Sequence, residues 1–234
     1  MLVTRYAHAA SYCAGKDVLE VGCGAGHGLG YIGGHAKRVV GGDCTHRLLK
    51  IASERYGATF PLVRLDAQGL PFSSASFDVV ILHEAIYYLA SPNAFVIEAR
   101  RLLRPGGRLI MSTVNRDWRD FNPSPFSHWY PTAMALRALL EMHFSSVEIS
   151  ASFPVLESSP HDAARSFVKR VAVRMGLIPK TMSGKRLLKR LFFGGLIQVP
   201  AEITDSLAPY VQPVRIPATG PCPGYKMLSA VALA

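Results

Sequence analysis

A run of closely spaced glycines follows an apolar stretch near the start of the chain. It reads Glu20-Val21-Gly22-Cys23-Gly24-Ala25-Gly26. Glycine tolerates positive φ and lets a ligand approach the backbone without a Cβ in the way. Asp43 follows these glycines by about 20 residues, the spacing at which an acid binds ribose hydroxyls in doubly wound sheets. The pattern predicts a site for a ribose-containing ligand held by Asp43. The alternative is that Asp43 only caps the turn or helix that follows it.

The glycine turn differs from the turn of dinucleotide-binding proteins. Their fingerprint requires a glycine at the position that His27 occupies here. A literal match to the fingerprint occurs at 28–33, inside the predicted helix that follows, and we interpret it as coincidental.

Apolar runs alternate with segments of helical periodicity along most of the chain. Five of these runs are predicted strands, at 17–21, 38–42, 59–65, 78–82 and 108–113. This alternation predicts an α/β fold, a parallel sheet with helices on both faces. Two more strands, at 147–152 and 226–234, bring the predicted sheet to seven strands.

The chain divides into three predicted regions. The core covers 1–153, an insertion covers 154–225, and 226–234 is the closing strand of the core. The insertion is expected to be helical, with helices at 162–175 and 184–193, and to cap the substrate site. Its lysines and arginines concentrate in 165–190.

Composition narrows the class of protein. The chain has 234 residues, of which 49% are hydrophobic and 18% charged, which is typical of a globular protein. The four cysteines have neither zinc spacing nor a disulfide framework, so no metal site is expected. The sequence shows no signal peptide and no apolar run long enough to span a membrane. We expect a cytoplasmic protein, with attachment to a membrane surface as an option.

Four segments, in order, resemble the motifs of class I S-adenosylmethionine-dependent methyltransferases. They lie at 20–26, 66–72, 76–80 and 101–109, and the resemblance covers roughly 5–150 and the last strand. The chain is most similar to the small-molecule, methyltransferase-11-like members. The resemblance implies a Rossmann-like, doubly wound, mostly parallel sheet with an antiparallel C-terminal strand. It also implies S-adenosylmethionine as cofactor, released as S-adenosylhomocysteine.

The same resemblance assigns cofactor contacts to individual residues. Glu20 would meet the methionyl ammonium, Asp43 the ribose diol, and Asp66 the adenine amine. An Arg5-Tyr6 pair would lie over the cofactor. The full set of implied cofactor-binding residues is Tyr6, Glu20, Gly22, Cys23, Gly24, Gly26, Asp43, Cys44, Asp66, Ala67 and His83.

Candidate catalytic residues lie where the fourth predicted strand ends, because ligands of open parallel sheets bind at the carboxyl ends of strands. His83 is a candidate general base, since its ordinary pKa is near neutrality; the alternative is that it contributes only backbone contacts. His128 is a second candidate base, with a surface or packing role as the alternative. Glu84 could orient His83 or the acceptor, or cap the next helix. Tyr87 and Tyr88 are expected to pack.

Absent motifs guide the choice of acceptor. The fourth strand is not followed by the Asp/Asn-Pro-Pro-aromatic turn of nucleobase amine methylation, nor by a Pro-Cys nucleophile. Ubiquinone-pathway O-methyltransferases resemble the chain around Glu84 but carry Glu-His where it has Tyr87-Tyr88. These differences favour a small-molecule acceptor over nucleic acid.

The basic insertion leaves three interpretations open. Its basic side chains could form a face that only contacts solvent. They could instead bind an anionic membrane, or a lipid-linked or phosphorylated acceptor, or they could bind RNA. RNA is the least favoured, because aromatic residues are not interleaved with the charges.

The expected function is therefore transfer of a methyl group to an oxygen, less favourably a nitrogen, of a small or glycan- or lipid-like metabolite. The basic insertion suggests an anionic acceptor. The alternatives are an RNA or protein methyltransferase, and a non-catalytic protein that binds S-adenosylmethionine and a partner.

Overall fold

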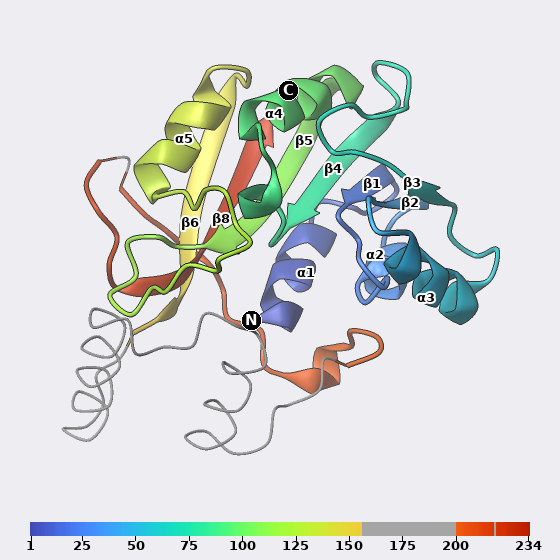
Figure 1. Cartoon of the computed structure of the whole chain (residues 1–234), viewed down its shortest axis with the longest axis horizontal. Helices are drawn as coiled ribbons and strands as arrows, with labels where there is room; N and C mark the ends of the chain where they lie inside the picture. The colour runs from blue at the N-terminus through green and yellow to red at the C-terminus, as the bar shows by residue number, and fades with distance from the viewer. Residues whose placement is uncertain (156–199, 218) are drawn as a thin grey trace.

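The computed structural model describes residues 1–155, 200–217 and 219–234 (Figure 1). The helices predicted at 162–175 and 184–193, and the basic stretch 165–190, lie outside the described residues. The part of the predicted insertion that is described, 200–217 and 219–225, can be compared with expectation.

The described residues form one sheet in the order β3-β2-β1-β4-β5-β8-β6-β7. Strands β1 to β5 pair in parallel, while β8 runs antiparallel to both β5 and β6. The strands are β1 (Asp17–Val21), β2 (Arg38–Asp43), β3 (Leu62–Arg64), β4 (Phe77–His83), β5 (Leu103–Val114), β6 (Ser146–Pro154), β7 (Val214–Arg215) and β8 (Tyr225–Leu233). This confirms the predicted Rossmann-like α/β fold with its antiparallel C-terminal strand.

The sheet has eight strands in the described residues, so the predicted count of seven was wrong. The extra strand, β7, pairs only two residues with β6, Arg215 with Ser150 and Val214 with Ala151. Two residues are too few to give a readable alternation of polar and apolar side chains. A second difference is that β3 begins at Leu62 rather than at Thr59, because Thr59 and Phe60 belong to the turn before it.

Helices cover both faces of the sheet (Figure 1). They are α1 (Leu2–Ala10), α2 (Leu29–Gly33), α3 (His46–Tyr56), α4 (Pro92–Leu102) and α5 (Ala133–Glu141). Side-chain oxygens fix the starts of the last two, since Ser91 Oγ accepts from Ala94 N and Thr132 Oγ1 accepts from Ala135 N. Two short 3-10 turns, η1 (Ile86–Tyr88) and η2 (Asp205–Leu207), are the other helical elements of the described ranges.

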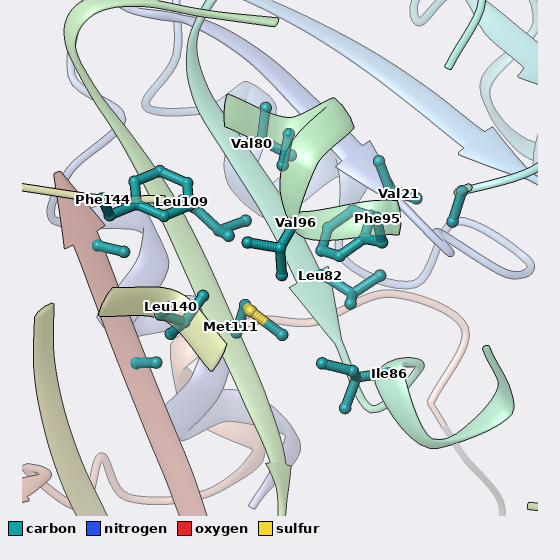
Figure 2. Close-up of a cluster of buried hydrophobic side chains, with 14 of the residues drawn as sticks. Val21, Val80, Leu82, Ile86, Phe95, Val96, Leu109, Met111, Leu140 and Phe144 are labelled. Atoms are coloured by element: carbon teal, nitrogen blue, oxygen red, sulfur yellow. The ribbon is translucent and has the colours of Figure 1, made fainter. Parts of the chain in front are cut away.

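Two buried clusters, one on each face, hold these layers together. One joins the sheet to α4 and α5; Figure 2 shows it with Phe95 and Val96 of α4 above Leu82 and Met111 of β4 and β5. The other joins the sheet to α1 and α2. Each fully buried large apolar side chain contributes about 1.5–3 kcal/mol. The sheet is therefore a rigid support for the loops at its carboxyl edge.

The described segment 200–217 packs against the helix that follows the glycine loop. Pro200 O lies 2.8 Å from His27 Nδ1, and Tyr31 Oη donates to Asp205 Oδ1 at 2.6 Å. Ile203 is buried in the cluster that contains α1 and α2. This part of the predicted insertion thus docks next to the glycine loop. Along the described ranges, no helix is long and apolar enough to cross a membrane.

Candidate cofactor and acceptor site

A pocket of about 860 Å³ opens at the carboxyl ends of β1, β2 and β4. Its size falls within the range of small-molecule sites, roughly 300–1,000 Å³. Eight of the residues singled out from the sequence line it: Gly22, Gly24, Asp43, Cys44, Asp66, Ala67, His83 and Glu84. They come from four different loops, which the strand order of the sheet brings together.

The glycine loop leaves bare backbone at the pocket wall. Gly22, Gly24 and Gly26 all have positive φ, between +58° and +77°. A Cβ added at Gly24 would meet no described atom within 4 Å, so this glycine faces open space in the pocket. Gly26 faces the protein instead, because a Cβ there would lie 3.0 Å from Ala52. Gly24 is thus the position at which a ligand can approach the backbone.

Asp43 connects the end of β2 to the glycine loop. Its Oδ2 accepts from Gly24 N at 2.9 Å and its Oδ1 accepts from Thr45 N at 2.8 Å. The residue is 7% exposed and lines the pocket. Since each carboxylate oxygen offers two lone pairs, both can still accept a bond from a ligand hydroxyl.

Tyr6 and Glu20 form a buried pair that does not line the pocket. Tyr6 Oη donates to Glu20 Oε1 at 2.5 Å, and Glu20 Oε2 is buried with no hydrogen-bond partner in the described chain. Burial raises the pKa of Glu20 to about 7. The carboxyl group therefore exchanges a proton near neutral pH, and a cation beside it would favour its charged form.

The glycines at 28–33, interpreted from the sequence as a coincidence, have a packing role. A Cβ at Gly28 would lie 1.8 Å from the Tyr6 ring, and one at Gly33 would lie 2.5 Å from Phe60. A Cβ at Gly30 would lie 1.7 Å from Glu202 Oε1. Side chains from three distant parts of the chain thus lie too close to the backbone at Gly28 and along α2 for a side chain larger than glycine at these positions.

His83 lines the pocket from the end of β4. Its Nδ1 lies 2.8 Å from Ser112 Oγ, and its ring meets the edge of Tyr6 at 4.9 Å. Nε2 is buried, without a hydrogen-bond partner in the part of the chain described. Burial, and secondarily the charge of Arg5, lower the pKa of His83 well below its ordinary value. The imidazole is therefore neutral at pH 7.

Glu84 follows directly and has a strained backbone. Its φ is +52°, which is rare outside glycine and occurs at functional sites. Its Oε2 accepts from Tyr87 Oη at 3.1 Å, and its Oε1 lies 3.7 Å from Arg5 Nη1 without a hydrogen bond to any described residue. Burial raises the pKa of Glu84. Glu84 thus presents a fixed carboxylate beside the end of β4.

Several predicted residues lie elsewhere. Cys23 is buried, and Gly26 packs on α3. His128 is exposed, and its backbone N–H donates to Tyr87 O at 2.8 Å. None of these three is among the described residues that line the pocket. Their predicted roles stay predictions.

Several lining residues were not predicted from the sequence, among them Arg64 and Tyr88. Arg64, at the end of β3, lines the pocket and donates through Nε to Cys44 O at 3.2 Å. Tyr88 was expected to pack, but it lines the pocket and is 53% exposed; Tyr87 does pack, at 8% exposed. The 3-10 turn explains the difference, since it places consecutive tyrosines on different sides. Across the described residues, no group of three His, Cys, Asp or Glu side chains could hold a metal ion.

Comparison with known proteins finds similarity to methyltransferases over part of the chain. The family model described as "Methyltransferase domain" matches residues 19–111. A protein of Mycolicibacterium smegmatis named "Probable S-adenosylmethionine-dependent methyltransferase" is 38% identical over 150 residues, 61% of this chain and 57% of that protein. A ubiquinone biosynthesis O-methyltransferase of Cereibacter sphaeroides is 33% identical over 110 residues, 46% of this chain and 44% of that protein.

Solved structures share the fold over nearly the whole chain. A Thermotoga maritima protein described as an S-adenosylmethionine-dependent methyltransferase and possible histamine N-methyltransferase has a TM-score of 0.62. It aligns with 98% of this chain and 87% of its own at 14% identity, which shows a common fold alone. The chain spans about half the length of the curated relatives that it matches.

Proposed function

We propose that residues 19–111, which match the methyltransferase domain model, form a class I, S-adenosylmethionine-dependent methyltransferase domain, and that the chain uses it to methylate a small molecule. The observation that carries the proposal is the pairing of Gly24, whose backbone faces the pocket, with Asp43, whose carboxylate lines it. Asp43 suits the ribose of a ligand, and Gly24 allows a neighbouring group of the same ligand to lie close to the backbone.

The residues at the pocket fit S-adenosylmethionine. Asp43 would hold the ribose hydroxyls, and Asp66 and Ala67 the adenine. The unpartnered Oε2 of Glu20, among the described atoms, suits the cationic methionyl end, although Glu20 lies outside the pocket wall. When bound, S-adenosylmethionine supplies an electrophilic methyl group on a sulfonium, whose sulfur keeps the bonding electron pair as the methyl group leaves.

The chain's own contribution is to position the acceptor. Holding donor and acceptor in line can itself supply about 7–11 kcal/mol of the barrier reduction. His83 and Glu84 lie at the end of β4, at the part of the pocket wall away from Asp66. We assign the acceptor to this end, with an oxygen as the atom methylated. The similarity to a protein named for O-methylation supports oxygen over nitrogen.

Calorimetric titration with S-adenosylmethionine and S-adenosylhomocysteine tests the cofactor assignment. Gly24→Ala places a methyl group in the space the cofactor would occupy and should abolish or strongly weaken binding. Gly15→Ala is the matched control, because Gly15 also has positive φ, at +69°, and an added Cβ there likewise meets no described atom within 4 Å. Both variants carry the same backbone strain, so only Gly24→Ala should affect binding.

An assay with labelled methyl donor and a metabolite extract tests the acceptor class. Incorporation into small molecules supports the proposal. Incorporation only into added RNA or protein would favour an RNA or protein methyltransferase instead. Cofactor binding without incorporation anywhere would favour a non-catalytic partner protein.

A further inference from the structure

An exposed aromatic ring stands at the acceptor end of the pocket. Tyr88, in the turn η1 after β4, lines the wall together with Glu84 and Leu89 and is 53% exposed. A large aromatic side chain exposed within a concave site offers a flat apolar surface to a ligand. Nothing in the assigned cofactor contacts uses this ring.

Other rings hold Tyr88 in place. The ring of Tyr87 meets it at 4.6 Å in an edge-on arrangement. Tyr87 stacks on Tyr130 at 4.7 Å with 25° between the planes, and Phe121 meets Tyr130 edge-on at 4.8 Å. Because these rings come from both the turn η1 and the segment between β5 and α5, Tyr88 is presented from a packed aromatic cluster. A prearranged surface loses less conformational entropy when it binds a ligand.

Two polar atoms of residues that line the same pocket make no hydrogen bond to a described residue, although one of them, Glu84 Oε1, lies 3.7 Å from Arg5 Nη1. Glu84 Oε1 and His83 Nε2 are both buried, belong to lining residues, and find no hydrogen-bond partner within the described ranges. Leaving buried polar atoms unpaired destabilises a protein, so a ligand that pairs with them gains affinity. A ligand hydroxyl both donates and accepts, so it can bond to a carboxylate oxygen or to an imidazole nitrogen.

Charge at this end disfavours an anionic ligand. The charged side chains among the described lining residues are Asp43, Asp66, Glu84 and Arg64. Arg64 contacts Cys44 at the end of β2, whereas Glu84 is the charged lining residue on the β4 side. The Arg5 guanidinium nearby is already paired with Glu84, with 3.7 Å between Nη1 and Oε1. A ligand carboxylate or phosphate beside Glu84 would meet a like charge.

We propose that Tyr88, Glu84 and His83 form the acceptor subsite, and that its ligand is an uncharged aromatic ring bearing a hydroxyl group. The inference rests on the proposed methyl transfer, and it replaces the anionic acceptor suggested by the basic insertion. Tyr88 contacts the ring, and Glu84 accepts the hydrogen bond of the hydroxyl. As the acceptor oxygen gains the methyl group, its O–H bond breaks, the electron pair stays on oxygen, and the proton passes to the Glu84 carboxylate.

Binding of matched probes to protein saturated with S-adenosylhomocysteine tests this subsite. The probes are a methylcatechol, the corresponding methylcyclohexanediol, and the corresponding dihydroxybenzoate. The methylcatechol should bind about fivefold to tenfold more tightly than the saturated diol, the size expected of one aromatic contact. The dihydroxybenzoate should bind more weakly than the methylcatechol.

Variants identify the residues. Tyr88→Ala should remove the preference for the aromatic probe, and Tyr88→Phe should keep it. Tyr210→Ala is the matched control, because Tyr210 is 48% exposed but is not a lining residue of the described pocket. Glu84→Gln should retain methylcatechol binding, lower kcat, and remove the acidic limb of the pH profile of kcat.

The two proposals can fail separately. Equal affinity for the three probes, absent binding of the methylcatechol, or an unchanged preference in Tyr88→Ala would overturn the aromatic subsite while S-adenosylhomocysteine still binds. If the wild-type protein does not bind S-adenosylhomocysteine, the methyltransferase proposal itself fails.

Discussion

The carboxylate of Asp43 accepts a hydrogen bond from the backbone amide of Gly24, with 2.9 Å between Oδ2 and N. The acid at the end of β2 therefore fixes the loop after β1, in addition to facing the pocket. We expect Asp43→Ala to weaken S-adenosylmethionine binding by about 1–3 kcal/mol, the range for lost hydrogen bonds to a charged group. Isothermal titration calorimetry measures the change.

Asp117 provides a matched control that distinguishes an effect on cofactor binding from an effect on folding. Asp117 Oδ2 accepts from Cys222 N at 3.1 Å and is not a lining residue of the described pocket. Asp117→Ala should lower stability without changing cofactor affinity. Equal affinity of Asp43→Ala and the wild type would remove Asp43 from the site.

Glu20 should make the stability of the ligand-free protein depend on pH. Its pKa is about 7 in the folded protein and near 4.5 when unfolded, so the folded state binds a proton more tightly. The stability this contributes is fully present below pH 4.5 and is lost as pH rises to about 7, a change of about 3 kcal/mol. Glu20→Gln lacks this loss, so its stability relative to the wild type should rise across that window in urea denaturation.

The same carboxyl group should report on the cofactor. A methionyl ammonium near Glu20 would favour its ionised form, so binding near pH 6.5 should release a proton. Calorimetry in two buffers of different ionisation enthalpy detects the release, which Glu20→Gln should abolish. Identical proton release in the variant and the wild type would place the cationic group elsewhere.

The close approach of Tyr6 to Gly28 predicts that a larger residue at position 28 lowers the stability of the folded protein. Gly28→Ala would place a methyl group 1.8 Å from a buried ring, so we expect a destabilisation of about 1–3 kcal/mol from overpacking. Gly34→Ala is the matched control at the end of the same helix, where the nearest atom to an added Cβ is 3.5 Å away. That substitution should be neutral or stabilise by about 0.4–1 kcal/mol. Urea denaturation measures the stability of both variants. Equal stability of Gly28→Ala and Gly34→Ala would show that the packing of α1 does not depend on this contact.

The sequence predicted the parts of the molecule that depend on local pattern. Buried strands such as β1 and β2 read as continuous apolar runs because both of their faces are covered. The position of Gly24 and Asp43 at the pocket could be predicted from the glycine spacing and from the acid about 20 residues later, because both residues lie at the ends of strands. Helix α1 was missed, although Val3, Tyr6 and Ala10 recur at helical spacing on its buried side.

What the sequence could not predict depends on contacts between distant segments. The glycines at 28–33 match a dinucleotide pattern, but only the fold shows that Tyr6, Phe60 and Glu202 reach them. The orientation of Tyr88 depends on a 3-10 turn of three residues, which is too short to leave a periodic signal. The neutral state of His83 depends on its burial under α1, which no local motif encodes.

His83 should stay neutral through the acid range where an ordinary histidine gains a proton. Its pKa is lowered well below 6.5 in the folded protein, chiefly by burial, so as pH falls below about 6.5 the unfolded chain takes up a proton that the folded chain refuses. The contribution of His83 to wild-type stability is therefore lost on acidification, so the stability of His83→Gln relative to the wild type should rise as pH falls from 7 to 5. Ser112→Ala, which removes the partner of Nδ1 but keeps the imidazole, should retain the wild-type loss.

If His83 contacts the acceptor through Nε2, His83→Gln should also lower kcat about tenfold to a hundredfold with little change in cofactor affinity. A pH profile of kcat that turns near 6.5 in the wild type and flattens in His83→Gln would instead show that the imidazole is protonated during turnover, and so contradict its neutral state.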